Sequence, residues 1–344
     1  MKIFFIASDK IVDDEGSFSK TNKILNLAHH NKLKIETLVI TPLSHPWDTP
    51  LKKNEFKSGA SAIAAIDYAK KILRSKKFDV VVIEGRDALK SGYEKKFRNT
   101  CMELYEHNST PLDGYERLTK VFLEQNKISE SEYFNLRDKT FINLAKTWNG
   151  PLPHEKWFEP LTHYFRGVDC ANPNIDFAGR IILAGPRVSN ILKTLKKDMI
   201  EVAGNSSIKL KVDGLESLEK VKNYRHLNRA FKMACNEAKI NFANLLQKKT
   251  ALMEVYTCYP VVPLGFLLST KLSSRKNLSH FLETTPLTIT GGLNLAKAPW
   301  NLTSLNALIE MRQKLIRSKK IKYGLVHGNG SLGNQQGITI LRSA

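Results

Sequence analysis

A turn, an amphipathic segment and an apolar run follow one another early in the chain. Ser58-Gly59 forms the turn, apolar residues recur every three or four positions over 63–73, and the apolar run 78–83 ends before Gly85. A period near 3.6 indicates a helix with one buried face, and a short continuous apolar run is typical of a strand covered on both faces. This stretch therefore predicts a helix followed by a buried strand that ends at Gly85.

The same order of features returns near the end of the chain. Gly291-Gly292 precedes an amphipathic segment over 303–317, and the apolar run 323–326 follows it. We expect this second strand to end at Gly328-Asn-Gly330. A helix and strand unit that occurs twice predicts two similar halves packed together, with α/β structure throughout the core.

A stretch rich in charged and aromatic residues separates the two units. Residues 86–160 contain candidate helices over 112–125 and 129–147, so they predict an inserted cap or loop domain. The expected domains are an N-terminal half over 1–185, which includes this insertion, and a C-terminal half over 186–344.

Three further segments complete the predicted elements. An amphipathic helix is expected over 223–238, and a strand over 251–256 is limited by Pro260. Residues 1–7 indicate a first buried strand, because they lack the longer apolar region and the cleavage site of a signal peptide. The longest apolar runs, such as 261–268, are far shorter than the roughly 20 residues that cross a bilayer, so no membrane span is predicted.

The charge of the chain is its one extreme feature. With 53 Lys and Arg against 33 Asp and Glu, the formal charge is +20 over 344 residues. Such a charge favours an anionic partner, which could be nucleic acid, a membrane surface or a phosphorylated ligand. The lysines are dispersed, however, and an evenly charged solvated surface explains the same composition. Nucleic-acid binding is the least supported of these functions, because no recognition module or clustered basic helix is present.

The cysteines and histidines suggest no metal site and no disulfide framework. The four cysteines, Cys101, Cys170, Cys235 and Cys258, are widely spaced and form no CxxC pair, which favours a reducing cytoplasm. A cluster of aromatic and imidazole side chains has no cysteine or paired carboxylate at metal-ligand spacing; its members are His154, Trp157, His163 and Tyr164.

Three motifs in the last third of the chain resemble those of thiolases. In order, they are Met253-Glu-Val-Tyr-Thr-Cys-Tyr-Pro260, Leu287-Thr-Ile-Thr-Gly-Gly-Leu293 and Tyr323-Gly-Leu-Val-His-Gly-Asn-Gly330. They are most similar to the sterol-carrier-type and thiolase-like acetyl-CoA acetyltransferases. Near the start, Lys57-Ser-Gly-Ala-Ser-Ala62 resembles the segment around the family's nucleophile. The resemblance implies two similar βα halves layered as α/β/α/β/α, with an inserted cap.

The resemblance also implies that two catalytic side chains are missing. Thiolases use a cysteine at the start of a buried helix, where the helix N-terminus stabilises the thiolate. Counted back three residues from Gly59, that position holds Phe56. The histidine of the family's Gly-His-Pro motif corresponds to Ala298, which precedes Pro299. Without both groups, ordinary acyl transfer and Claisen condensation are expected to be absent.

Two further positions match the family's site, and a cysteine within one of the family motifs offers another possible reactive group. Tyr256 replaces the Asn or His that donates to the thioester oxygen, and His327 replaces the second cysteine. His327 is either an acid or base or a hydrogen-bonded structural residue. Cys258 is either a relocated nucleophile or a small buried apolar residue.

The glycine turns leave two roles open. Gly291, Gly292, Gly328 and Gly330 could bind phosphate groups, but they fit neither the P-loop nor the dinucleotide fingerprint, and glycine also permits close backbone packing. No required cofactor is predicted, and CoA or an acyl-CoA is the expected ligand. We therefore expect a thiolase-like protein of acyl or lipid metabolism, and an altered acyl-transfer reaction stays open. The alternative is a non-catalytic scaffold or subunit. The expected assembly is a homodimer or a heteromer with a thiolase-type enzyme.

Overall fold

The strands form one mixed sheet path whose first five members belong to the N-terminal half. The computed structural model describes residues 1–47, 49–103 and 110–343. The first five strands lie in the order β4-β3-β5-β6-β1. Their bounds are Glu55–Phe56 for β4, Ile35–Ile40 for β3, Val80–Ala88 for β5, Asp176–Ala184 for β6 and Phe4–Val12 for β1, and β2 at Glu15–Gly16 pairs with β1. β3 is parallel to β4 and β5, whereas β6 is antiparallel to β5 and β1.

The C-terminal strands repeat this arrangement. They lie in the order β8-β9-β10-β7, with bounds Ala251–Glu254, Tyr323–Gly330, Gln335–Ser343 and Ile200–Lys209. β8 is parallel to β9, and β10 is antiparallel to both β9 and β7, as in the first set. The two sets of strands meet where β1 is antiparallel to β7, with Phe4 opposite Glu201 and Phe5 opposite Ile200. The duplication predicted from the sequence is therefore present in the strand order, while the domain limits at 185 and 186 stay a prediction.

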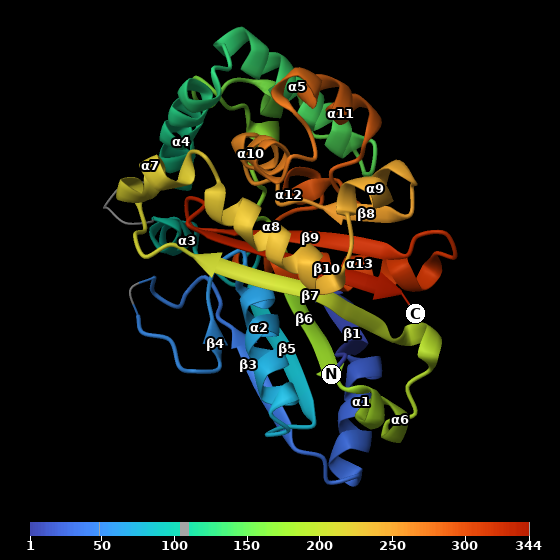
Figure 1. Cartoon of the computed structure of the whole chain (residues 1–344). Helices are drawn as coiled ribbons and strands as arrows, with labels where there is room; N and C mark the ends of the chain where they lie inside the picture. The colour runs from blue at the N-terminus through green and yellow to red at the C-terminus, as the bar shows by residue number, and fades with distance from the viewer. Residues whose placement is uncertain (48, 104–109, 344) are drawn as a thin grey trace.

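Two helices fill the layer between the sheets. α2 (Ser61–Arg74) and α13 (Thr303–Arg317) pack on each other and on strands of both sets. Ile63 and Ile66 of α2 are fully buried because the apolar face of that helix meets a sheet on each side. α1 (Ser19–His30) covers β1 and β6 from outside, and α8 (Arg225–Ala238) covers β7 and β10 (Figure 1). The predicted α/β/α/β/α layering is confirmed.

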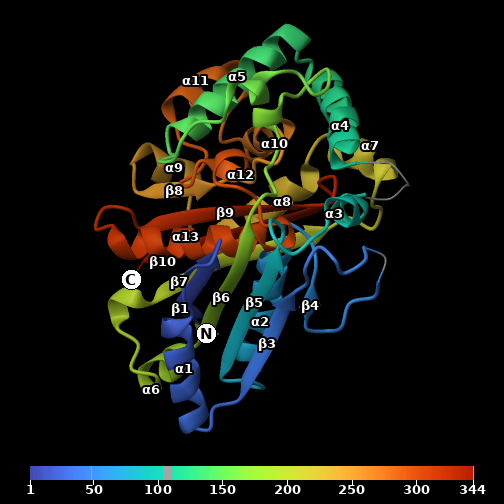
Figure 2. The ribbon, with the colours of Figure 1, turned by 180° about the vertical axis from the view of Figure 1, so that it is seen from behind.

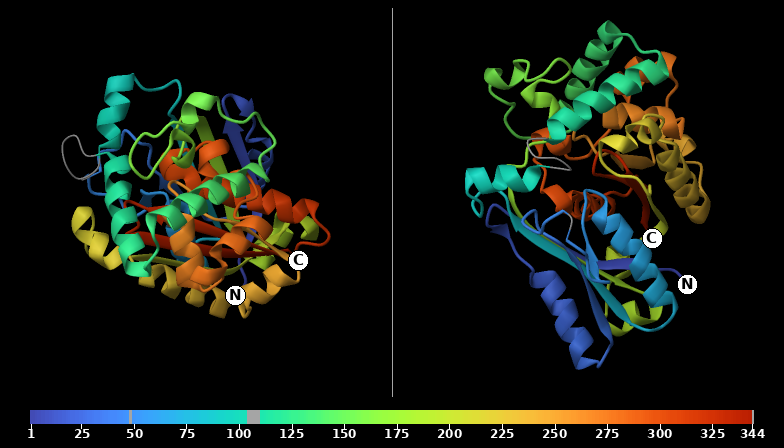
Figure 3. Two further views of the ribbon diagram at one scale, coloured as in Figure 1. Left: turned by 90° about the horizontal axis from the view of Figure 1, so that it is seen from above. Right: turned by 90° about the vertical axis from the view of Figure 1, so that its left-hand side faces the viewer.

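A helical cap lies over the second sheet and away from the first (Figures 2 and 3). It contains α4 (Pro111–Asn126) and α5 (Glu130–Ala145) from the predicted insertion, together with α10 (Val261–Thr270) and α11 (Leu278–Thr284), whereas α3 (Lys95–Met102) of the same insertion lies beside the sheets and packs against the core between them. α4 begins with a capping box, in which Thr110 and Asp113 exchange hydrogen bonds. Residues 104–109 of the predicted insertion lie outside the described residues. The remaining helices are α6 (Pro186–Ile191), α7 (Leu218–Val221), α9 (Phe242–Gln247) and α12 (Gly292–Leu295).

Two strand ends differ from the predictions. β5 continues past Gly85 to Ala88, because residues 86–88 still pair with 176–178 of β6. β9 ends at Gly330, within the glycine turn predicted to end it. β8 ends at Glu254 instead of reaching Tyr256. Within the described part of the chain, no helix is long and apolar enough to cross a membrane.

Candidate functional site

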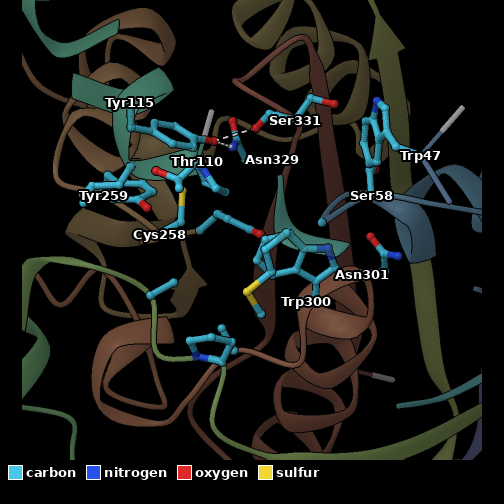
Figure 4. Close-up of a pocket in the computed structure, with 18 residues that line it drawn as sticks. Trp47, Ser58, Thr110, Tyr115, Cys258, Tyr259, Trp300, Asn301, Asn329 and Ser331 are labelled. Atoms are coloured by element: carbon cyan, nitrogen blue, oxygen red, sulfur yellow. Dashed lines mark hydrogen bonds between the residues drawn. The ribbon is translucent and has the colours of Figure 1, made fainter. Parts of the chain in front are cut away.

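A cavity of about 210 Å³ lies where the N-terminus of α2 meets the cap (Figure 4). Its walls come from the turn before α2, the loop after β8, the turn after β9, the start of α4 and the segment before α13. The lining residues are Trp47, Ser58, Gly59, Met102, Thr110, Pro111, Leu112, Tyr115, Ala171, Pro173, Tyr256, Cys258, Tyr259, Ala298, Trp300, Asn301, Asn329 and Ser331. The cavity thus joins segments from both halves and from the insertion.

Ser58 is the side chain that the turn before α2 presents to the cavity. Its backbone φ is +134°, a conformation that non-glycine residues adopt only when the surrounding structure holds them there. The Ser58 hydroxyl donates to Oε1 of Gln335 at 2.8 Å and accepts from the Ala60 N–H at 3.1 Å. Neither partner can take a proton from Ser58, so this hydroxyl lacks an activating base.

Phe56, the position that the motif comparison assigned to the nucleophile, lies elsewhere. It sits in β4, where it pairs with Ile40 of β3, and its ring centroid is 6.3 Å from that of Tyr68. Phe56 packs against the core between the sheets and is not a cavity residue. The side chain of Phe56 therefore does not fill the cavity. Sequence analysis did not single out Ser58, whose one signal in the sequence is its place in a Ser-Gly pair before a helix.

Gly59 permits the closest approach in the site. A Cβ atom at this position would fall well inside van der Waals contact with the carbonyl oxygen of Asn329 and the hydroxyl of Tyr256. Tyr256 thus places its hydroxyl directly over the start of α2. Tyr256 therefore lies on the cavity wall. Burial raises the pKa of its hydroxyl, which stays protonated at neutral pH.

Cys258 is the cavity's thiol, and its surroundings suppress its reactivity. Burial raises its pKa to about 12, against a smaller lowering by the Tyr115 hydroxyl. Tyr115 reaches the cavity from α4, and its ring stacks on Tyr259 with centroids 4.3 Å apart. The thiol is therefore protonated at neutral pH, and only the thiolate is a good nucleophile.

Ala298 occupies the place where the resemblance implies an imidazole. Its methyl group is buried on the cavity wall, and its N–H donates to the carbonyl oxygen of Asn172 at 2.7 Å. The neighbouring Asn301 directs its side-chain amide to the carbonyl oxygen of Thr41 at 3.0 Å. The segment before α13 therefore contributes no acid or base to the cavity.

His327 lies in β9 behind the cavity wall and is not a lining residue. Its Nδ1 accepts from the Tyr256 N–H at 3.4 Å, so Nε2 carries the proton and donates to Oε1 of Gln336 at 2.7 Å. Its ring stacks on Phe266 of α10 at 4.9 Å. Burial lowers the pKa of His327 to about 4, so the imidazole is neutral at physiological pH.

A directed chain of hydrogen bonds runs from His327 to the cavity. Gln336 donates to Oδ1 of Asn329 at 2.6 Å, and Asn329 donates to the Tyr115 hydroxyl at 2.7 Å. Tyr115 in turn donates to the carbonyl oxygen of Ser331 at 2.7 Å (Figure 4). His327 is therefore connected to the cavity wall through Gln336, Asn329 and Tyr115, and sequence reasoning singled out none of these three.

The four glycines proposed as phosphate turns do not line the cavity. Gly292 has φ +72°, and a Cβ there would meet the Thr257 hydroxyl, which accepts from the Leu293 N–H at 2.9 Å. Gly291 packs against Trp148, and Gly328 and Gly330 lie against the turn at Ala60 and Ser58. Close packing is the contact that each of them makes in this structure.

The cavity walls are electrically neutral. Among the described residues that line it, none is Lys, Arg, His, Asp or Glu, and the titratable groups are the thiol and phenols discussed above. Likewise, no group of three or more potential metal ligands occurs in the part of the chain that the structure describes. The cavity can hold a small, largely apolar group and offer it hydroxyl and amide hydrogen bonds.

Comparison with solved structures shows the fold. A monomeric SCP2-thiolase-like protein type 1 from Mycobacterium smegmatis aligns with 99% of this chain and 77% of its own, with a TM-score of 0.71 and 14% identity. An Ltp2–ChsH2(DUF35) aldolase aligns over 99% and 98%, with a TM-score of 0.70 and 11% identity. The acetyl-CoA acetyltransferase from Syntrophomonas wolfei aligns over 99% of both chains, with a TM-score of 0.62 and 12% identity.

Sequence comparisons add nothing to this. No protein-family model matches the chain, and no curated protein matches it. The thiolase-like fold predicted from the three motifs is confirmed, and identities of 11 to 14% extend the likeness no further than the fold.

Proposed function

We propose that the cavity binds the acyl part of a CoA ester and that the protein does not carry out the thiolase reaction. The observation behind this proposal is the neutral wall at the N-terminus of α2. A thiolase reaction there would require a thiolate, a base and an oxyanion donor. Cys258 is protonated, Ser58 has no base, and Ala298 has no donor in its side chain.

Ligand binding needs less than catalysis. An acyl chain would lie against apolar wall residues such as Leu112 and Met102, and its carbonyl oxygen would meet the positive end of the α2 dipole. The phosphates of CoA would lie outside the neutral cavity and would depend on individual lysines there, because residues 90–156 carry 11 Lys and Arg against 10 Asp and Glu and so have almost no net charge. Near the cavity, the ammonium of Lys57 lies 5.6 Å from the ring of Trp47, a lining residue.

Calorimetric titration with CoA and acetyl-CoA at low and high salt tests the proposal. Acetyl-CoA should bind saturably, more tightly than CoA, and should keep this preference at high salt, because the acyl contacts are not screened. Ala298→Leu would place three more carbon atoms in the cavity and should remove the preference for acetyl-CoA. Ala296→Leu is the matched control, because Ala296 is partly exposed and does not line the cavity.

Two outcomes would contradict the proposal. If acetyl-CoA and CoA bind equally, and binding disappears with salt, the attraction is charge alone. Thiolysis of acetoacetyl-CoA that Cys258→Ala abolishes would show that a thiolate forms after all, and the non-catalytic part of the proposal would fail.

A second candidate is a subunit role beside another protein. The support is the two-component aldolase named above, which matches this chain over nearly the whole length of both. The cap also exposes large apolar side chains at Leu152, Trp157 and Leu161. Sedimentation of the purified protein, alone and with an active thiolase-type enzyme, tests this role. A monomer under both conditions would remove its support.

A further inference from the structure

A second hollow, which shares no lining residue with the cavity, opens beside the first sheet. This basic groove has a volume of about 780 Å³ and lies between α1, β1, the segment after α6 and the C-terminal half of α13. Its size suits a small organic ligand, for which pockets of about 300 to 1,000 Å³ are usual.

Positive charge from four separate segments converges on the basic groove. Its lining includes six cationic side chains and two carboxylates. The cationic residues are Lys10, Lys20, Lys23, Lys193, Arg312 and Arg317. Asp9 and Asp198 are the acidic ones, and Asp9 is already engaged by the N–H and hydroxyl of Thr21 at 2.7 and 3.0 Å.

Arg312 is the buried cation of this groove. Only 6% of the residue is exposed, and its guanidinium donates to the Ser8 hydroxyl at 3.3 Å and to the carbonyl oxygens of Ile6 and Asp198 at 3.2 and 2.5 Å. Among the described residues it forms no ion pair, and its Nε has no hydrogen-bond partner. Burial lowers its pKa to about 10, although the nearby charges of Asp198 and Asp9 oppose this shift.

Two lysines on the first turns of α1 extend this positive charge to the surface. Lys20 and Lys23 are exposed, and neither forms an ion pair within the described ranges. Lys10, by contrast, pairs with Glu310. The remaining wall is apolar and includes Ile24 and Leu192. A ligand that matches both features would have an apolar body and more than one anionic group.

We propose that the basic groove binds a small molecule with an apolar body and two or more phosphates, such as a nucleoside polyphosphate. The phosphates would lie between Lys20, Lys23 and the guanidinium of Arg312, and the apolar part would lie along the α1 wall. The concave shape favours a small ligand over a flat membrane surface, even though Leu195 at its rim is 58% exposed. This site is independent of the acyl cavity.

Calorimetric titration with pyrophosphate and with ATP at about 0.15 M salt tests the inference. ATP should bind saturably and more tightly than pyrophosphate, because only ATP has a body that contacts the apolar wall. The double variant Lys20→Ala, Lys23→Ala should weaken ATP binding about tenfold or more. The matched control is Lys248→Ala, Lys249→Ala, which removes the same charge from two exposed lysines after α9, at the far side of the molecule from α1 (Figure 1).

Two further measurements separate this site from other sources of binding. Arg312→Lys keeps the charge but loses the planar donor group, and it should weaken ATP binding without unfolding the chain. Ala298→Leu in the acyl cavity should leave ATP binding unchanged, so the two proposals fail separately. Equal weakening by both lysine pairs, or the absence of saturable ATP binding, would overturn the inference. Sedimentation with phosphatidylserine vesicles in the absence of ATP binding would overturn it in favour of a membrane contact.

Discussion

Glu254 gives the sharpest prediction for stability. This carboxyl ends β8 and is 4% exposed; it accepts from the Ile289 N–H and the Thr290 hydroxyl, both at 2.7 Å. Burial raises its pKa from the ordinary 4.5 to about 7 despite these bonds. The folded protein therefore binds this proton more tightly than the unfolded chain, so the contribution of Glu254 to the free energy of unfolding falls as the pH rises from about 4.5 to about 7.

The expected magnitude follows from the size of that difference. Each pKa unit is worth about 1.4 kcal/mol, so ionisation of Glu254 should cost the folded state about 3 kcal/mol above pH 7. Glu254→Gln has the same shape as the protonated side chain and cannot ionise. It should match the wild type near pH 5 and exceed it by about 3 kcal/mol at pH 8.

Urea unfolding of both proteins between pH 5 and pH 8 measures this difference. Glu216→Gln is the control, because Glu216 is exposed and its replacement should give a difference that does not change with pH. A difference between Glu254→Gln and wild type that is the same at every pH would refute the reasoning. A wild type that is more stable than the variant at pH 8 would also refute it, because the carboxylate would then be stabilised by its donors.

Three further outcomes are expected. His327→Gln should gain stability relative to the wild type at pH 4.5 compared with pH 7, because the lowered folded pKa of His327 makes its own contribution to the free energy of unfolding fall as pH drops from 6.5 towards 4; urea midpoints of both proteins at the two pH values measure this, and a difference that does not change with pH would contradict it. Cys258 should react with iodoacetamide at pH 8 much more slowly in the folded than in the unfolded protein, as mass spectrometry would show; equal rates would contradict a raised thiol pKa. Gly59→Ala should destabilise the fold by about 1–3 kcal/mol, because its Cβ would collide with Asn329 and Tyr256; an unchanged urea midpoint would contradict this.

The elements that the sequence predicted well are those with one strong period. The helix over 303–317 has the predicted bounds because its apolar residues face two sheets from a single stripe. The apolar run 261–268 has no such period, since α10 is buried on all sides within the cap. The strand end at Gly85 was placed too early, because pairing with a neighbouring strand decides where a strand stops and the sequence alone does not reveal that neighbour.

The candidate site was less predictable for a related reason. Motif counting located Tyr256, Cys258 and Ala298, and all three line the cavity. It matched the nucleophile position to Phe56, which does not line the cavity, and did not single out Ser58, which does. The backbone conformation of Ser58 could not be predicted from its residue type. Asn329 and Tyr115 become functional candidates only when β9 and α4 meet in space.

The residues around the cavity differ in how strongly the fold depends on them. α2 and α13 are held by their buried faces between two sheets, and their N-termini are joined where the Ser61 hydroxyl donates to the carbonyl oxygen of Asn301 at 2.7 Å. Asn301 therefore belongs both to the cavity wall and to the contact between the two helices. Gly59 is constrained as well, because the wall formed by Asn329 and Tyr256 rests on it. The side chain of Ala298 is a single methyl group on the wall, so a larger residue there should change the space in the cavity before it changes the packing of the two helices.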